Sequence, residues 1–499
     1  MKFLEIKNYY ILYLLIIVFF TVSFLQFDNY LAPGLEILIF ILIFLFGAFS
    51  LYYYTQNEDN LHKVAFVIIL LFGITCVFLT PINDVSDEAE HFTRSEIVST
   101  GQISTKYIQI PNNSESGYLT IKSIDDFSQS TNLNVFNTKV DDNKIDYTPT
   151  YFSSAFSQNP FYSYLPQAFG IFFAKILDLN GIWMLWLGRL FNLLLYAGII
   201  SLAIKKAPIL KFPLLIVSIL PLAIYQAASL SVDGMFSSLA ILAFAYFLHF
   251  YKTPNIEWKD LGIFYLAIIL SGLLKTPFLA LSLLIFLVPN EHFESKNQNI
   301  ISKLAILLSL GIGIAWSSYA TSVLTNSWRG EFFAAKHVNA TEQMAYLINH
   351  PIFSLERLFN TISESPTIID RFFYFSNDVG QYFSSLLSIL YMLFFTIFSL
   401  IYPLNEKFDL KTRIKGFIIG TIIYLGVIGV QYLTWASVGA ETVMNGVYSR
   451  YFMPLLIFIP LIINTDLIEF DRKSLELLSL TVAMSFISGM IMLTLSAKY

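Results

Sequence analysis

The sequence predicts an all-α polytopic membrane protein, a bundle of about 13 transmembrane helices with two larger segments outside the membrane. Hydrophobic residues make up 56% of the 499 positions and charged residues only 13%, which is too apolar for a soluble domain. Apolar runs of about 20 residues, long enough to cross a bilayer, recur along the chain. The alternating pattern of a membrane β-barrel is absent, so we expect the spans to be helical.

The hydropathy criterion marks the individual spans. They lie at residues 11–27, 35–54, 64–80, 182–204, 208–227, 234–251, 260–274, 277–289, 302–324, 380–402, 414–434, 450–464 and 475–495. The first lacks a small-residue cleavage site and another span follows at once, so we expect a retained helix and not a removed signal peptide. The chain then divides into two N-terminal helices (1–63), a membrane core (64–464) and a C-terminal helix (465–499).

The charges of the short loops predict the orientation. Lys and Arg gather in the short loops of one side, for example at Lys205 and Lys206, while short loops of the other side, such as 27–34, carry none. Positively charged short loops stay in the cytoplasm, so we expect a cytoplasmic N-terminus and outward-facing segments 81–181 and 325–379. The Asn-, Ile-, Lys- and Phe-rich composition is associated with bacteria of low GC content, which makes a bacterial plasma membrane the expected location.

Several classes of function are disfavoured by what the sequence contains. The net charge of −5 is uninformative about nucleic acid, but basic runs that could follow a phosphate backbone are absent, so we expect no nucleic-acid partner. Cys76 is the only cysteine, which excludes an intramolecular disulfide and cysteine-based metal chemistry. The histidines lack the spacing of zinc ligands. Neither a phosphate-cradling glycine loop nor a Gly-x-Ser-x-Gly elbow is present, which disfavours nucleotide hydrolysis and serine esterase chemistry.

A cluster of charge follows the third span directly, in residues 81–94. It contains Asp84, Asp87, Glu88, Glu90, His91 and Arg94. Ionised groups at the membrane edge are costly to keep dry and are usually held by a function. A carboxylate beside a histidine and an arginine can act as a general base for a hydroxyl or bind a cation. A helix N-terminus would also use Ser86 followed by Glu90, so a capping role stays open.

Three cations lie at similar depth near the outer ends of separate helices: Arg189, Lys275 and Arg450. Such a set would hold a phosphate in the headgroup layer through charge-assisted hydrogen bonds. Each alone is also explained by snorkelling to lipid headgroups. Asp233 lies in a short outer turn, where it either caps the next helix or joins the site.

The outer segments change character along their length. From residue 101 to about residue 150 the first is rich in Ser, Asn, Asp and Thr, which predicts loops with short strands or turns. Residues 159–177 are apolar but interrupted by prolines, which favours an amphipathic helix lying in the outer interface. The second outer segment contains another plausible amphipathic helix at 349–360.

Six segments in order resemble one family. They are the Pro, Asp-Glu, His pattern of 81–94, Tyr164-Leu-Pro-Gln-Ala-Phe-Gly170, Leu187-Gly-Arg-Leu-Phe-Asn192, Ser229-Leu-Ser-Val-Asp233, Leu274-Lys-Thr-Pro277, and 446–454. From about residue 64 to 464 the chain resembles the uncharacterised membrane family DUF2142, which is similar to the GT-C superfamily of glycosyltransferases.

The resemblance implies a GT-C-like fold, an acidic outer loop near the reaction centre and a polyprenyl-phosphate sugar as donor. It makes Asp87 and Glu88 the acidic pair, and Lys275 and Arg450 contacts to the donor phosphate. Tyr164 and Gln167 become part of the outer interfacial helix. Two departures stand out: the acidic loop follows the third span instead of the first, and Tyr448-Ser449 replaces the usual Gln-Gly before the Arg-Tyr pair. The second departure leaves the substrate open.

The expected function is therefore inverting transfer of a sugar from polyprenyl phosphate to a cell-surface glycan or lipid-linked acceptor at the outer leaflet. Asp87 or Glu88 would be the catalytic base. The expected substrate contacts are His91, Arg94, Tyr164, Gln167, Arg189, Asp233, Lys275, Arg450 and Tyr451. A divalent cation, Mg²⁺ or Mn²⁺, on the carboxylates is left open. The alternatives are a transporter or flippase of a lipid-linked saccharide and a non-catalytic component of a cell-envelope assembly complex.

Overall fold

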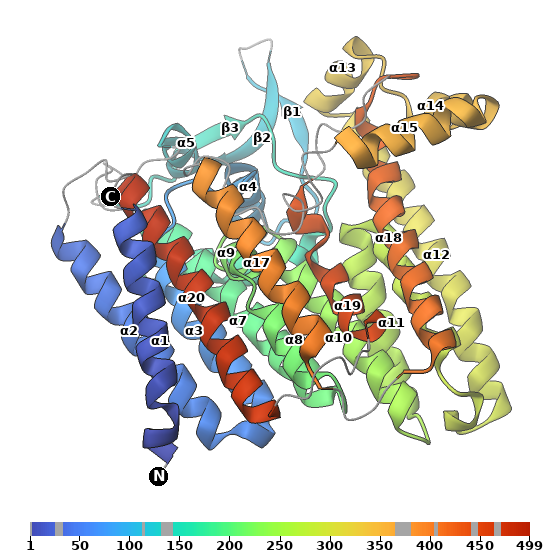
Figure 1. The fold of residues 1–499 in the computed structure, drawn as a ribbon. Helices are drawn as coiled ribbons and strands as arrows, with labels where there is room; N and C mark the ends of the chain where they lie inside the picture. Colours follow the sequence, from blue (N-terminus) through green and yellow to red (C-terminus); the bar gives the residue numbers. More distant parts are fainter. Residues whose placement is uncertain are drawn as a thin grey trace.

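Long helices form the body of the molecule, and a smaller layer of strands and short helices covers one end of it (Figure 1). The computed structural model describes residues 2–24, 33–111, 115–130, 143–364, 381–403, 408–440, 448–463 and 471–499. Within these ranges, eight helices are long and apolar enough to cross a membrane. They are α1 (Lys2–Phe24), α2 (Pro33–Gln56), α3 (Leu61–Leu79), α7 (Ile182–Lys206), α10 (Asp233–Lys252), α12 (Lys296–Thr325), α18 (Leu410–Trp435) and α20 (Arg472–Lys498).

The other predicted spans are not among these eight, and most of them are short or broken, so the expected count of about 13 is not confirmed. The apolar stretches are present as α8 (Lys211–Ser218), α9 (Pro221–Ala227), α11 (Trp258–Leu274), η4 (Thr276–Leu287), α17 (Gln381–Ile401), η7 (Met453–Ile457) and α19 (Phe458–Ile462). Prolines mark the breaks, as at Pro221, because proline lacks the amide hydrogen that an inner helical position donates. All seven residues of α9 are buried, as interrupted backbone at membrane depth requires.

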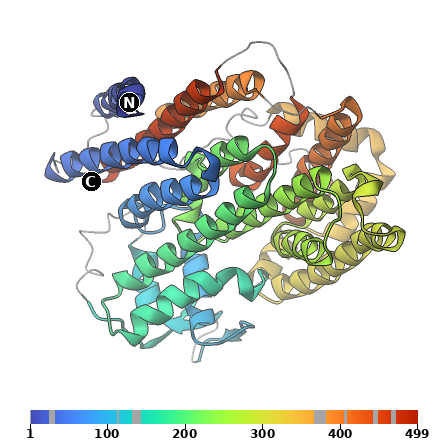
Figure 2. The same cartoon turned by 90° about the horizontal axis from the view of Figure 1, so that it is seen from below.

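Helix α7 lies at the centre of the bundle and contacts α3, α6 and α10. Seen along the bundle, α1, α2 and α20 lie on one flank and α12 lies at the opposite edge (Figure 2). The two ends of the chain therefore pack together, and the Tyr13 hydroxyl lies 2.7 Å from that of Ser488. The predicted division at residues 63 and 464 stays a prediction.

The first outer segment, residues 81–181, folds into the layer of strands and short helices that covers one end of the bundle (Figure 1). They are α4 (Glu88–Ser99), β1 (Tyr107–Gln109), β2 (Ser116–Ile121), α5 (Lys122–Gln129), β3 (Pro149–Phe152), η3 (Phe161–Tyr164) and α6 (Leu165–Ile176). The strands form an antiparallel sheet in the order β1-β2-β3, with Tyr118 opposite Tyr107 and Phe152. Short strands thus lie where the polar composition predicted strands or turns.

Helix α6 occupies most of the stretch predicted to be an interfacial helix. One face packs on α7 so closely that a Cβ on Gly170 would lie 2.3 Å from the Leu187 carbonyl oxygen. The other face exposes apolar side chains, among them Phe169, Phe172 and Ile176. This two-sided pattern is the one expected of a helix that lies between protein and a lipid interface.

The second outer segment lies at the same end of the bundle (Figure 1). It begins with α13 (Trp328–Ala335), α14 (Ala340–Asn349) and α15 (Pro351–Glu364). Helix α15 covers most of the predicted amphipathic stretch, and residues 365–380 lie outside the described ranges. The side of a membrane that this end faces stays a prediction.

Candidate functional site

A cavity of about 410 Å³ opens where the two outer segments meet the ends of α10, α11 and α18. Six of the predicted site residues line it: Asp87, His91, Asp233, Lys275, Arg450 and Tyr451. Further lining residues include Phe156, Asn159, Arg329, Trp435 and Tyr448. Residues separated by more than 300 positions in the sequence therefore meet at one place.

Asp87 faces this cavity from the first position before α4. Its backbone is left-handed, with φ at 65°, a conformation that is uncommon for a residue other than glycine. Although it occupies the N-cap position, its side chain makes no capping hydrogen bond. It accepts a 2.6 Å hydrogen bond from Nη2 of Arg450 instead. Helix capping, the alternative open at the sequence level, is thus not what this side chain does.

Arg450 joins two carboxylates. Besides Asp87, its Nε lies 3.0 Å from an Asp233 oxygen, and the Arg450 and Asp233 side chains are both nearly fully buried. The side chain of Asp87 is 37% exposed, which makes it the more open of the two carboxylates. Burial alone would raise the pKa of Asp87, but the charge of Arg450 and further cations outweigh burial and lower that pKa. Asp87 is therefore ionised at neutral pH.

Glu88, the next residue, lies in a different environment. Its two oxygens accept hydrogen bonds of 2.8 and 2.6 Å from Arg189, and both side chains are fully buried. Arg189 also donates to the carbonyls of Thr80 and Pro81, and the Leu230 amide donates to Glu88. Neither member of the pair lines the cavity. This ion pair links α7 to the loop after α3. Its geometry indicates a structural role for both residues.

A single turn of 3-10 helix, η6 (Ser449–Tyr451), carries much of one cavity wall. The Lys275 ammonium lies 3.5 Å from the centre of the Tyr451 ring, and the Arg450 guanidinium lies 4.6 Å from that of Tyr448. Such cation–π contacts hold a charged group in place without neutralising it. Within the described residues, Lys275 has no carboxylate partner.

His91 lines the cavity one helical turn after Asp87. Its Nδ1 lies 2.9 Å from the Tyr164 hydroxyl, which also accepts a hydrogen bond from Asn159. Burial lowers the pKa of His91 to about 4, so the ring is neutral at physiological pH. Tyr164 itself is buried behind the histidine and positions it.

Two other predicted contacts also lie behind the cavity wall. Arg94 is buried and donates to the Ile103 carbonyl, and the side-chain amide of Gln167 donates to the Leu230 carbonyl. Neither lines the cavity. Both support the outer layer, and a role in substrate contact stays a prediction without a geometric basis.

Arg329 was missed at the sequence level. It lies in the first turn of α13, and its guanidinium lies 5.4, 5.4 and 4.9 Å from the ring centres of Phe156, Trp328 and Trp435. The only signal in the sequence is its place in an aromatic stretch near the start of the second outer segment. That signal cannot tell which way the segment folds.

The cavity adjoins an apolar groove of about 390 Å³, and the two share Thr276 and Pro277. The groove lies between α12, η4 and α18, and its lining includes Leu310, Ile314 and Ile422, all with large exposed fractions. The cavity contains two cations, Lys275 and Arg329, that have no carboxylate partner among the described residues, and it continues into an apolar groove. This combination suits a ligand that has an anionic head and a hydrocarbon tail.

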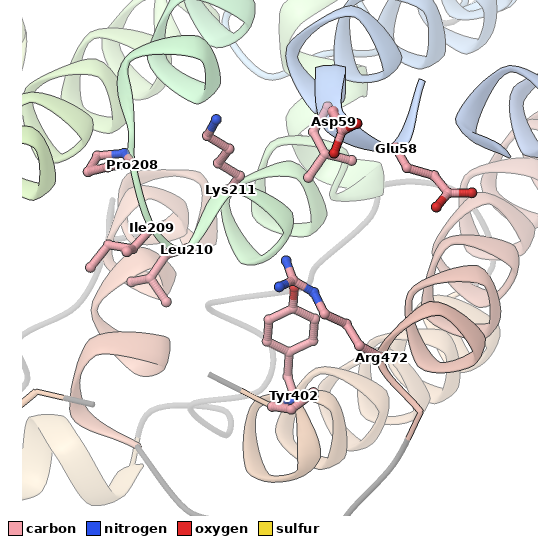
Figure 3. A pocket seen from close by; sticks show the side chains of 10 residues that line it. Glu58, Asp59, Pro208, Ile209, Leu210, Lys211, Tyr402 and Arg472 are labelled. Carbon is pink, nitrogen blue, oxygen red and sulfur yellow. The ribbon is translucent and has the colours of Figure 1, made fainter. Parts of the chain in front are cut away.

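A second cavity, of about 280 Å³, lies at the opposite end of the bundle and is lined by Glu58, Asp59, Lys211, Tyr402 and Arg472 (Figure 3). It contains none of the predicted site residues. Two of its charged residues form local pairs: Glu58 lies 2.9 Å from Lys473, and Arg472 lies 2.9 Å from Glu476. The candidate functional site is therefore the cavity lined by Asp87, Lys275 and Arg450, which we call the outer cavity.

The residues of the outer cavity do not suit a divalent cation. Its described carboxylates, Asp87 and Asp233, both face Arg450, whose charge competes with a metal for their oxygens. Across the described ranges, no group of three or more His, Cys, Asp or Glu side chains is placed to hold a metal ion.

A family model described as a predicted membrane protein, DUF2142, matches residues 70–459. The chain belongs to this family. The match contains every residue of the outer cavity and leaves α1, α2 and α20 outside it. No curated protein and no solved structure matches the chain. The DUF2142 model thus establishes a membrane protein family, and the similarity to GT-C enzymes stays a prediction.

Proposed function

We propose that this DUF2142 protein is an inverting glycosyltransferase of a bacterial plasma membrane. It would move a sugar from a polyprenyl-phosphate donor to a cell-surface glycan or lipid-linked acceptor at the outer leaflet. The observation that carries the proposal is the shared cavity, which is lined by the ionised Asp87 carboxylate and by the Lys275 ammonium, without a carboxylate partner in the described ranges, and which adjoins an apolar groove. These are the three chemical elements that transfer from a lipid phosphate requires.

Asp87 would act as the general base. One oxygen of the acceptor attacks the anomeric carbon while Asp87 takes the hydroxyl proton, and the bond between that carbon and the phosphate oxygen breaks. Polyprenyl phosphate leaves with the bonding electrons. The acceptor oxygen enters opposite the departing phosphate, so configuration at the anomeric carbon inverts.

Lys275 would stabilise the leaving phosphate, whose charge develops in the transition state. We assign Arg450 a different role from the phosphate contact expected from the sequence, because two carboxylates already compensate its charge. Arg450 would position Asp87 and keep it ionised. Proton transfer and leaving-group stabilisation would then fall to residues from separate parts of the matched region, Asp87 near its start and Lys275 near its middle.

Transfer can be tested with the purified full chain in lipid nanodiscs, supplied with polyprenyl-phosphate sugars and extracted cell-envelope glycan. We expect acceptor-dependent release of polyprenyl phosphate, with loss of release in Asp87→Asn. A matched control is Asp126→Asn, which changes an aspartate of the outer layer that does not line the cavity. Absence of transfer with every donor would contradict the proposal.

The broken helices α8 and α9 favour one rival, a transporter or flippase, since interrupted helices are common in transporters. That rival predicts movement of an intact lipid-linked saccharide across a proteoliposome membrane. Label transferred to the acceptor favours the enzyme, whereas intact donor that changes leaflet favours the rival. A non-catalytic assembly component would do neither.

A further inference from the structure

The second outer segment contributes one charged side chain to the cavity, Arg329 on α13. Its guanidinium is enclosed by the rings of Phe156, Trp328 and Trp435 at 4.9 to 5.4 Å. Stacked rings fix the plane of a guanidinium while its N–H groups stay free to donate. The rings therefore orient the Arg329 guanidinium and leave its N–H groups available to donate hydrogen bonds to a ligand.

No carboxylate pairs with Arg329 among the residues that the structure describes, and its side chain makes no hydrogen bond there. Arg450, in the same cavity, has two carboxylates. Burial lowers the pKa of Arg329, and the charges of Asp87 and Glu90 oppose this shift without cancelling it. Among the described residues no carboxylate forms a direct ion pair with this half-buried cation, so a ligand that brings a negative charge into contact with it would be stabilised.

The charges of the cavity can be counted. Arg329, Lys275 and Arg450 supply three positive charges, Asp87 and Asp233 supply two negative charges, and His91 is neutral. The net charge of these groups is therefore +1. Both carboxylates pair with Arg450, so among the described residues Arg329 and Lys275 are the lining cations without a paired carboxylate. These two residues reach the cavity from different helices, α13 and the end of α11.

We propose that Arg329 and Lys275 together bind the phosphate of a lipid phosphate whose chain lies in the groove between α12 and α18. This inference rests on the proposed function and deepens it, because it replaces Arg450 by Arg329 as the second phosphate contact. The guanidinium would supply directed hydrogen bonds to two phosphate oxygens, and the ammonium would supply a point charge. Arg329 is thus a binding residue provided by the second outer segment.

The test compares two probes that share a chain: a polyprenyl phosphate and the matching polyprenol, each bound to the detergent-purified full chain. We expect the wild type to prefer the phosphate. Arg329→Gln and Lys275→Gln should each weaken phosphate binding about tenfold to a hundredfold, which is the effect of losing one charge-assisted hydrogen bond, and leave polyprenol binding unchanged. Inorganic phosphate should compete only weakly, because it lacks the chain.

Arg357→Gln is the matched control. Arg357 lies on α15 of the same segment and stacks on Phe353 at 4.6 Å, but it does not line the cavity. The Arg357→Gln variant should bind both probes as the wild type does. If Arg329→Gln is poorly folded, Arg329→Lys keeps the charge while removing the fork of donors, and it should show an intermediate affinity for the phosphate.

The outcomes separate this inference from the proposed function. A wild type that binds phosphate and alcohol equally overturns both. A wild type that prefers the phosphate, with the same preference in Arg329→Gln, overturns only the assignment of Arg329. Equal weakening for both probes would show that Arg329 only packs against the rings, which also overturns the assignment. Efficient competition by inorganic phosphate would overturn the lipid source of the anion.

Discussion

Asp87 and Glu88 are adjacent in sequence and have the same charge, yet they lie in opposite environments. Glu88 is fully buried against Arg189, and its oxygens accept hydrogen bonds from Arg189 and the Leu230 amide. Asp87 pairs with Arg450 but keeps 37% of its side chain exposed to the cavity. The difference separates a closed ion pair that holds elements together from an open one that can meet a ligand.

The left-handed backbone of Asp87 produces this divergence. The turn directs one side chain toward η6 and the next toward α7, so two consecutive carboxylates serve different parts of the molecule. If the comparison is correct, substitutions at the open pair should affect activity, and those at the closed pair should affect folding.

The largest expected effect is on catalysis. Asp87→Asn keeps the shape of the side chain and removes the proton acceptor, so turnover should fall by a factor on the order of 100 to 10,000. The unfolding temperature should change little, because Arg450 still faces Asp233. Transfer rate and thermal unfolding, measured on the same preparation, check this; full activity would contradict the role of Asp87.

Glu88→Gln should produce the reverse pattern. Removing one charge strands Arg189 in a buried site, where breaking an ion pair costs about 3–5 kcal/mol. We expect little folded protein, measured by size-exclusion chromatography and by unfolding in denaturing detergent. Glu88→Gln combined with Arg189→Met should recover part of the stability. A stable but inactive Glu88→Gln protein would place catalysis on Glu88 and overturn the comparison.

A smaller effect on stability should come from His91. Burial lowers the pKa of this histidine to about 4. Between pH 6.5 and 4 the unfolded chain binds a proton that the folded chain does not, so stability falls as the pH decreases, by at most about 3 kcal/mol. His91→Gln should remove this part of the pH dependence. Unfolding temperatures at pH 7 and pH 5 test it, and equal slopes for both proteins would show that His91 is not the group responsible.

The smallest effect should come from an exposed pair. Lys473 lies 2.9 Å from Glu58, with about two fifths of each side chain exposed to solvent. Exposed pairs contribute less than about 1 kcal/mol, so Lys473→Ala should unfold within a few degrees of the wild type. A loss as large as that of Glu88→Gln would mean that burial does not distinguish the pairs.

Hydropathy predicted most of the helices, because an apolar run of sufficient length has few other ways to satisfy its backbone. It overestimated the number of long spans where prolines divide an apolar run, as at Pro221. The convergence of Asp87, Lys275 and Arg450 was predictable because each lies beside the outer end of a separate helix.

The pairing within the site was not predictable from the sequence. Nothing in two consecutive carboxylates indicates that one is buried by Arg189, since this depends on how α7 packs against the loop after α3. Arg329 was missed for the same kind of reason. Its place in the cavity depends on the path of the second outer segment, which has no hydropathy signal to fix it.

The backbone conformation of Asp87 restricts which residues can stand there. Left-handed geometry is tolerated by glycine, asparagine and aspartate far better than by other residues. Only aspartate among these also provides an anion. Among related chains, Asn or Gly at this position would therefore preserve the backbone conformation and remove the negative charge. Such proteins would be expected to bind the ligand without catalysing transfer.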